Sequence, residues 1–486
     1  MVGGKLGKMM GKRVAVVVGG SVAGLACAHA VAGAGWDVVV LEKAAAAAAT
    51  GAGTGAGLGL DAQSMETLAR WIPGWGLDDA TLPLAVDLVI PRPALFSITR
   101  ARSFEVRSEV VRSLCGGALR SCHRPQNRAT DSETKAARTL ARDDEFNFRA
   151  AHWGDLHRRL HEALPAEVTV LWGHQFLSFE TPEDDDTRGG VVATARVLRT
   201  GETVEVTGDL LVAADGSTSS IRRRFLPDLK LRYSGYCAWR GVFDFAGKDS
   251  SDTMVGIRRA YPELGNCLYF DLAYKTHAVL YELPRSRLNW LWYINGPEPE
   301  LTVMAIPLPL IASSVTMEVT DAMVARMRDE AERVWCPELA RLVRETAAPF
   351  VNVIYDADPP PRLSWEGGRV VLVGDAAHPT TPHGLRSTNM SIMDARTLGR
   401  CLARWEKTET TTPARAVAEY EAVRLPVVAA QVMHARRLGR IKQGLPVDGE
   451  AEGFDVTTAV EDSMLLLRQR SMPFFSGAPT VDDGGL

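Results

Sequence analysis

Runs of apolar residues in the first 43 positions predict a strand, a helix and a second strand. Residues 13–20 form a continuous run dominated by valine, which is typical of a strand buried on both faces. Small residues over 21–35 end in glycine and predict a helix, and residues 36–43 form the second apolar run. This order predicts a βαβ unit, the building block of a parallel sheet covered by helices.

The rest of the chain divides into a strand-rich middle and a helical end. Apolar runs predict strands at 168–173, 191–198, 202–208, 209–216 and 369–373, and residues 232–296 form a longer strand-rich, aromatic region. Apolar residues at helical spacing predict helices at 61–72, 153–164, 319–335, 389–405 and 413–444. This mixture of elements predicts an α/β protein.

Three stretches do not follow these patterns. Residues 88–128 contain eight arginines but only two acidic residues, and residues 302–314 contain no charged residue. We expect both to be loops or insertions, because structureless segments of this length are uncommon inside a compact domain. An alternative for 88–128 is a basic arm that binds an acidic partner. The Gly/Ala mixture at 44–59 predicts a flexible or close-approach loop.

Composition and charge exclude several classes of protein. The 46% hydrophobic and 23% charged residues are ordinary for a globular protein, and a net charge of -4 gives no global field for nucleic acid. The seven cysteines form no C-x-x-C pair, so neither a disulfide framework nor a metal site is expected. No apolar run is long enough for a transmembrane helix, and the first 12 residues lack the apolar core of a signal peptide. We therefore expect a cytoplasmic protein, either a monomer or a homodimer.

A glycine-rich turn joins the first predicted strand to the first helix. Small residues make such a turn tight, and free N–H groups at the helix start attract a pyrophosphate. Glu42 ends the second strand, near the spacing expected of a carboxylate that binds an adenosine ribose. The predicted nucleotide-binding residues are Gly19, Gly20, Ser21, Val22, Ala23, Gly24, Glu42 and Lys43. The alternative is a glycine turn between packed elements, with Glu42 as a solvated charge.

Two later motifs bear on which nucleotide the chain binds. Residues 215–222 (DGSTSSIR) and 374–379 (GDAAHP) each follow an apolar strand. They resemble the DGxxSxxR and GDAAHP motifs of FAD-dependent aromatic hydroxylases of the p-hydroxybenzoate hydroxylase type, the group A flavoprotein monooxygenases. The run PTTPHGLRSTNMSI at 379–392 resembles that of plant members. The resemblance extends from about Lys12 to Gly444, apart from the two odd segments.

The resemblance implies a Rossmann-like FAD-binding domain, a β-sheet substrate domain and C-terminal helices. The expected division is an FAD-binding domain at 11–87, 129–228 and 355–400, a substrate domain at 229–354, C-terminal helices at 401–445, an insertion or disordered loop at 88–128, and a tail at 446–486.

The resemblance also implies a reaction. The expected cofactors are FAD and, as reductant, NADH or NADPH. Together with O2 they would form a flavin C4a-hydroperoxide, which hydroxylates a small aromatic or conjugated molecule. One alternative is an FAD oxidoreductase that is not a monooxygenase, and another is a non-catalytic flavin or nucleotide sensor. A peripheral membrane enzyme that acts on a lipid-like quinone precursor is a third.

Within this frame, individual residues acquire expected roles. Asp375 would accept hydrogen bonds from ribityl hydroxyls, with a helix N-cap as the alternative. Arg149 would reach the FAD, or else be a surface arginine. His378 would belong to the structural motif rather than to acid–base catalysis. The remaining expected cofactor contacts are Gly57, Asp215, Gly216, Gly374, Pro379, Ser387 and Asn389.

One departure from the family pattern lies just before Asn389. The family often has Gly-x-Gly there, close to the flavin, whereas this chain has Leu385, Arg386 and Ser387. Arg386 would place a positive charge beside the ring. Arg240 is the one charge in its strand and could bind a carboxylate or phenolate, or pair at the surface. Aromatic side chains expected to line the substrate site or the core are Tyr236, Trp239, Tyr269, Phe270, Trp290, Trp292 and Tyr293.

Overall fold

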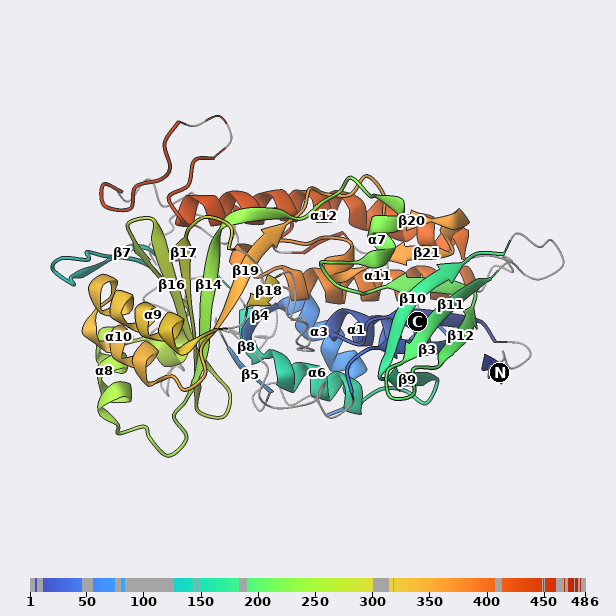
Figure 1. Ribbon diagram of the computed structural model, residues 1–486, viewed down its shortest axis with the longest axis horizontal. Helices are drawn as coiled ribbons and strands as arrows, with labels where there is room; N and C mark the ends of the chain where they lie inside the picture. The colour runs from blue at the N-terminus through green and yellow to red at the C-terminus, as the bar shows by residue number, and fades with distance from the viewer. Residues whose placement is uncertain are drawn as a thin grey trace, which may run out of the picture.

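The computed structural model describes residues 5–6, 12–45, 56–74, 80–83, 126–142, 146, 148–182, 190–299, 314–317, 319–406 and 413–447, with shorter stretches from 449 to 481. The molecule is elongated, with a large antiparallel region at one end and the sheet of the predicted βαβ unit at the other (Figure 1). A long helix, α12 (Ala414–Lys442), runs along both regions.

The predicted βαβ unit forms the centre of a six-stranded sheet. Strand β2 (Val14–Val18) leads into helix α1 (Val22–Gly33) and then β3 (Asp37–Glu42), which lies parallel to β2. The full strand order is β20 (Ser364–Trp365), β21 (Val370–Leu372), β13 (Leu210–Ala213), β2, β3 and β9 (Val168–Trp172). All neighbours are parallel except β20 and β21. The apolar runs predict the five parallel strands of this sheet correctly, whereas β20 was not predicted.

Helices cover this sheet closely. Helix α11 (Ser387–Glu406) packs against α1, and a Cβ added at Gly399 of α11 would lie 2.5 Å from the carbonyl oxygen of Ala30. The glycine thus permits the two helix backbones to approach. Helices α3 (Ala62–Trp71), α6 (Trp153–Glu162) and α7 (Ser220–Phe225) complete this end of the molecule.

Two smaller sheets flank the six-stranded one. The first has the order β1 (Lys5–Leu6), β12 (Thr203–Gly208), β11 (Val191–Val197) and β10 (His174–Glu180). The second has the order β4 (Gly57–Asp61), β8 (Phe148–His152) and β5 (Thr81–Pro83). Strand β4 corrects the prediction of a loop over 44–59, because residues 57–59 pair with β8; residues 46–55 lie outside the described residues.

An eight-stranded sheet forms the other end. Its order is β18 (Ser314–Met317), β19 (Phe350–Asp356), β14 (Arg232–Asp244), β17 (Arg287–Asn295), β16 (Thr276–Leu283), β15 (Tyr269–Ala273), β6 (Gln126–Thr130) and β7 (Ala137–Arg142). Helices α8 (Asp252–Ala260), α9 (Asp321–Val334) and α10 (Pro337–Glu345) cover its outer face (Figure 1). Helix α8 was not predicted within the strand-rich region.

The position of β6 and β7 corrects one predicted boundary. These strands pair with β15 and with each other, so 126–142 lies in the eight-stranded sheet and not with the six-stranded one. The expected boundary at 129 is therefore wrong, and the expected insertion cannot include 126–128. The rest of that segment, and 302–313, lie outside the described residues.

Short 3-10 turns connect these elements, and residues of the last two line the cavities described below. They are η1 (Leu264–Asn266), η2 (Glu366–Gly368), η3 (Gly374–Ala376) and η4 (Pro382–Gly384). Among the helices in the described part of the chain, none is long and apolar enough to cross a membrane.

Candidate functional site

A groove of about 380 Å³ follows the carboxyl ends of β2, β3 and β13. Ligands of open parallel α/β sheets bind at this edge. We call it the nucleotide groove. Of the predicted residues it is lined by Gly19, Gly20, Ser21, Val22, Ala23, Glu42, Lys43, Asp215, Gly216, Asp375 and Ser387. Other lining residues were not predicted from the sequence, because they belong to no motif. Among them are Trp153, His157 and His174.

The glycine turn of this groove leaves no room for side chains at two positions. Gly19 has a φ of +105°, and a Cβ there would lie 2.3 Å from the carbonyl oxygen of Ala214. A Cβ at Gly24 would lie 1.8 Å from the carbonyl oxygen of Gly19. Ser21 has a φ of -75°, an ordinary conformation, which explains why serine fits there. The first turn of α1 contains no acidic residue of its own, and its positive end faces the groove.

The Glu42 carboxylate is held at the rim of the groove by backbone donors. Its Oε2 accepts from the N–H of Gly20 at 2.6 Å, and its Oε1 accepts from that of Ala44 at 2.7 Å. A carboxylate has about four lone-pair positions. It can therefore accept further hydrogen bonds from hydroxyl groups in the groove.

Arg222 joins the two later motifs. Its buried guanidinium donates to the carbonyl oxygens of Asp375 and Ala376 at 3.2 and 2.9 Å. Ser219 caps α7 by accepting from the N–H of Arg222 at 2.9 Å. The DGxxSxxR pattern thus has a structural reason: its arginine fixes the backbone of the GDAAHP turn. Arg222 belongs to the motif at 215–222, but the motif alone predicts no such role for it.

The two acids of these motifs face the groove with acceptor oxygens. Asp215 Oδ2 accepts from the N–H of Ser220 at 2.8 Å, while its buried Oδ1 has no hydrogen-bond partner among the described residues. Asp375 Oδ1 accepts from the hydroxyl of Ser387 at 2.8 Å. The groove wall therefore offers acceptors suited to ligand hydroxyls.

His378 lies in a buried charge network away from both cavities. Its Nε2 lies 2.6 Å from Asp394 Oδ2, and the other oxygen of Asp394 accepts from Arg424 Nε at 2.7 Å. Burial raises the pKa of Asp394, but the attraction of His378 and Arg424 outweighs it and holds that pKa at about 2. His378 is 1% exposed. This position supports the expected structural role over acid–base catalysis.

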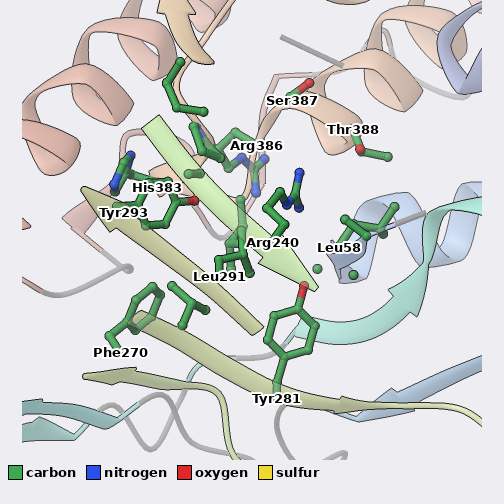
Figure 2. Close-up of a pocket in the computed structure, with 18 of the residues that line it drawn as sticks. Leu58, Arg240, Phe270, Tyr281, Leu291, Tyr293, His383, Arg386, Ser387 and Thr388 are labelled. Atoms are coloured by element: carbon green, nitrogen blue, oxygen red, sulfur yellow. The ribbon is translucent and has the colours of Figure 1, made fainter. Parts of the chain in front are cut away.

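A second cavity of about 110 Å³ adjoins the groove, and both share Trp153, Ser387 and Thr388. We call it the inner cavity. Side chains of β14 to β17 form one wall, and the stretches 56–59 and 382–388 form the other. Figure 2 shows Tyr293, Phe270 and His383 at one end, and Arg240, Tyr281 and Leu58 at the other. The end near Leu58 is the one closer to Ser387 and Thr388, and so to the groove.

The two arginines of the inner cavity differ in their partners. Arg386 forms an ion pair with Asp61, Nη1 to Oδ2, at 2.8 Å. Arg240 donates to the neutral Asn352 side chain at 3.2 Å, and no ion pair of Arg240 with an acid is found among the described residues. Burial lowers the pKa of Arg240. Of the two arginines that line this cavity, Arg240 is thus the one whose positive charge no acid among the described residues balances.

Leu385 occupies the conformation that the family's glycine would favour. Its φ is 56° and its ψ is 31°, in the left-handed region, which costs an L-residue roughly 1–2 kcal/mol. In return its side chain lines the inner cavity and lies over Gly59. The replacement of the family's glycine by Leu385 therefore changes the cavity wall, while the backbone keeps the turn.

Several predicted residues do not line either cavity within the described structure. Arg149 donates from Nε to the hydroxyl of Thr81 at 2.6 Å, within the sheet of β4, β8 and β5. Asn389 donates to the carbonyl oxygen of Gly59 at 2.8 Å and accepts from the N–H of Asp61 at 2.9 Å, so it anchors β4 to α11. Gly24, Pro379 and Gly374 are likewise absent from both linings. Gly57 lines the inner cavity, where a Cβ would lie 2.4 Å from the Tyr281 hydroxyl.

The aromatic residues of the middle region separate onto two faces of the sheet. Tyr236, Phe270 and Tyr293 pack in the cluster on the cavity side, and the last two line the inner cavity. Trp239, Tyr269, Trp290 and Trp292 instead pack in the core beneath α8, α9 and α10. The alternation expected of strands thus assigns about half of them to the cavity side.

A known protein family matches the part of the chain that builds this groove. A family described as "FAD binding domain" matches residues 12–235 and 362–435, more than half of the chain. The chain belongs to this FAD-binding family. The two matched ranges contain all the strands of the six-stranded sheet and both later motifs.

Curated relatives align with about half of this chain. It is 30% identical over 248 residues to aurachin C monooxygenase/isomerase of Stigmatella aurantiaca, covering 51% of this chain and 55% of that protein. It is 28% identical over 261 residues to 6-hydroxynicotinate 3-monooxygenase of Pseudomonas fluorescens, covering 53% of this chain and 57% of that protein. The chain thus spans less than two thirds of the length of these relatives.

Solved structures confirm the fold. 2,6-Dihydroxypyridine-3-hydroxylase from Arthrobacter nicotinovorans superimposes with a TM-score of 0.66 at 20% identity, over 98% of this chain and 99% of that one. A salicylate hydroxylase in complex with its substrate gives a TM-score of 0.63 at 17% identity. The fold is the predicted p-hydroxybenzoate hydroxylase-like α/β fold.

The residues of the groove fit FAD. The start of α1 lines the groove with the backbone N–H groups that a helix leaves unbonded in its first turn, and these suit a pyrophosphate. Glu42 and Asp375 lie at separate places along the groove, as acceptors for the hydroxyls of an adenosine ribose and of a ribityl chain.

Proposed function

We propose that this protein is an FAD-dependent monooxygenase that hydroxylates a small aromatic or conjugated molecule, with NADH or NADPH as reductant and O2 as co-substrate. The observation that carries the proposal is the continuity of the nucleotide groove with an inner cavity of mainly apolar lining. The names of the matched relatives, an aurachin C monooxygenase/isomerase and a 6-hydroxynicotinate 3-monooxygenase, support it.

The groove residues have separate roles in holding the cofactor. The turn at Gly19 and the start of α1 would bind the pyrophosphate, Glu42 the adenosine ribose, and Asp375 the ribityl chain. Gly57 and the stretch 385–388 would lie beside the flavin ring, because they line the inner cavity and Ser387 and Thr388 line the groove as well. When bound, FAD supplies the redox chemistry, taking two electrons from the nicotinamide and activating O2. The remaining predicted residues would support these contacts from outside the groove rather than line it. They are Arg149, Gly24, Pro379, Gly374 and Asn389.

The inner cavity would bind and orient the ring to be hydroxylated. Leu58, Leu291 and Phe270 provide apolar walls that exclude water. Arg240, whose charge the described protein does not balance, would attract an anionic substituent to the end nearer the groove. The overall reaction consumes the aromatic compound, O2, NAD(P)H and a proton, and yields the hydroxylated product, NAD(P)+ and water.

Two further assignments accompany this proposal. A cytoplasmic location is proposed from the sequence. Membership of a plant-type branch rests on the run at 379–392 alone, since the matched relatives come from bacteria and from plants.

Purification and a visible spectrum provide the direct test. We expect a yellow protein, or an apoprotein that binds FAD with a Kd in the micromolar range or tighter, about -8 kcal/mol. NADH and NADPH oxidation should then be followed over a panel of phenols, aromatic acids and heteroaromatics. Substrate-stimulated oxidation with a hydroxylated product supports the proposal. FAD binding without any stimulated turnover would favour the sensor instead.

A further inference from the structure

The nucleotide groove and the inner cavity meet at three residues from two elements. Of the described residues, Trp153, Ser387 and Thr388 line both. Ser387 and Thr388 begin α11, and the Ser387 hydroxyl donates to Asp375, the proposed acceptor for the ribityl chain. Because the flavin ring is joined to the ribityl chain, a ring that extends from Asp375 into the inner cavity passes these residues. We call the three residues the passage.

Trp153 is the aromatic member of the passage, and its ring is held in one orientation. It begins α6, and its backbone N–H donates to the carbonyl oxygen of Ala56 at 3.1 Å. Its ring stacks on that of His157, with centroids 5.0 Å apart and an angle of 13° between the planes. Nε2 of His157 donates in turn to the carbonyl oxygen of Gly20 at 2.8 Å. The indole is therefore fixed relative to the glycine turn that would bind the pyrophosphate.

The rest of the indole packs into the protein core. It belongs to a buried cluster with Val22 of α1, Leu60 of β4 and Ile392 of α11. The Trp153 side chain is 8% exposed and borders both cavities. A side chain fixed in this way loses little further freedom when a ligand packs against it, which favours binding. The passage thus contains a rigid aromatic surface where a planar ring would lie, and aromatic rings pack well against one another.

We propose that Trp153 is a flavin-contact residue, whose indole packs against the isoalloxazine ring in the passage and so positions the ring at the mouth of the inner cavity. The inference rests on the proposed function, in particular on the proposed placement of FAD. It has a spectroscopic signature. An indole in contact with a light-excited flavin gives it one electron and receives that electron back in the dark, so nothing is consumed and the flavin emission is quenched. A tryptophan that is purely structural would not quench it.

The first test compares the emission lifetime of bound FAD in three proteins. Emission from the wild type should be short-lived. In Trp153→Phe, which keeps an aromatic ring but is a much poorer electron donor, the lifetime should lengthen several-fold. Trp172→Phe is the matched control, because Trp172 lies in β9 of the same sheet region and lines neither cavity. Its lifetime should equal that of the wild type. An unchanged lifetime in Trp153→Phe, or an equal change in both variants, overturns the proposal.

The second test uses the wild-type chain labelled with fluorotryptophan and followed by ¹⁹F NMR. FAD should shift the resonance of Trp153, identified as the one lost in Trp153→Phe or Trp153→Tyr. Saturating ADP, which has the adenosine and the diphosphate but no flavin, should leave it in place. No shift with FAD, or an equal shift with ADP, overturns the proposal, because Trp153 would then not contact the flavin ring.

Both measurements are made without NAD(P)H or substrate, so they are independent of turnover. Quenching by Trp153 without any substrate-stimulated NAD(P)H oxidation would refute the monooxygenase and leave the flavin contact standing. Stimulated oxidation with an unchanged lifetime in Trp153→Phe would do the reverse. Failure of the folded wild type to bind FAD would overturn both.

Discussion

Asp375 and His378 are three residues apart in one motif but lie in different surroundings. Asp375 borders the nucleotide groove and accepts from the Ser387 hydroxyl at 2.8 Å, whereas His378 is buried against Asp394. The same hexapeptide therefore combines a ligand-facing acid with a residue that stabilises the turn. Substitutions at the two positions should affect different properties of the protein.

We expect Asp375→Ala to weaken FAD binding by about 1.5–3 kcal/mol, because a charge-assisted hydrogen bond to the ribityl chain is lost. His378→Ala should mainly lower the free energy of unfolding, by about 1–3 kcal/mol, since Asp394 loses a buried partner. FAD titration and urea denaturation of both variants separate these effects. Asp375→Asn is the matched control, keeping the shape without the charge. A larger loss of FAD affinity in His378→Ala than in Asp375→Ala would contradict this assignment.

At the scale of elements, α12 makes a close contact that supports the inner cavity. A Cβ added at Gly439 would lie 2.5 Å from the Tyr236 hydroxyl and 2.8 Å from His383 Nδ1. Gly439→Ala should therefore overpack this contact and destabilise the protein by about 1–3 kcal/mol. Gly33→Ala in α1 is the control, because a Cβ there meets nothing within 4 Å. The melting temperatures of both variants are measured by thermal unfolding. Equal melting temperatures would contradict the prediction and show that α12 moves to accommodate the added methyl group.

Elements with a clear period were predictable, and those fixed by tertiary pairing were not. The β2–α1–β3 unit and α11 follow directly from apolar runs and helical spacing. Strand β4 was missed because its glycine-rich sequence has no strand propensity and is held by pairing with β8 and by Asn389. Strand β6 was missed since it ends an arginine-rich stretch with no period, and its place depends on β15.

At the scale of the whole molecule, the two cavities differ in how far sequence reveals them. The nucleotide groove contains short motifs, each with its own glycine or acid, so the motif residues of its lining could be predicted, whereas lining residues outside the motifs, such as Trp153 and His157, could not. The inner cavity is assembled from single residues of β14 to β17, η4 and β4. His277 and Tyr281 sit in an apolar strand without a motif, so only the folded sheet brings them to the cavity. Arg240 was noticed because it is the one charge in its strand, and Arg386 because it departs from the family's Gly-x-Gly pattern.

The arginine-rich segment gives the last prediction, at the scale of the chain as a whole. Residues 88–125, which lie outside the described residues, differ in composition from their flanks and show no secondary-structure period, and β6 begins at Gln126. Deleting 88–125 with a short Gly/Ser join should therefore leave FAD binding intact, because halving a flexible loop changes closure entropy by only about 0.6 kcal/mol. Flavin content and Kd for FAD are the measurements.

The same variant separates this prediction from a role as a lid. A lid would leave FAD binding normal but let the truncated enzyme oxidise NAD(P)H wastefully and release peroxide, because water would reach the inner cavity. Coupling is measured as hydroxylated product per NAD(P)H consumed. An insoluble or flavin-free variant would contradict the prediction and place the segment within the fold. Retaining β6 is essential to this comparison, since its pairing with β15 and β7 holds the edge of the eight-stranded sheet.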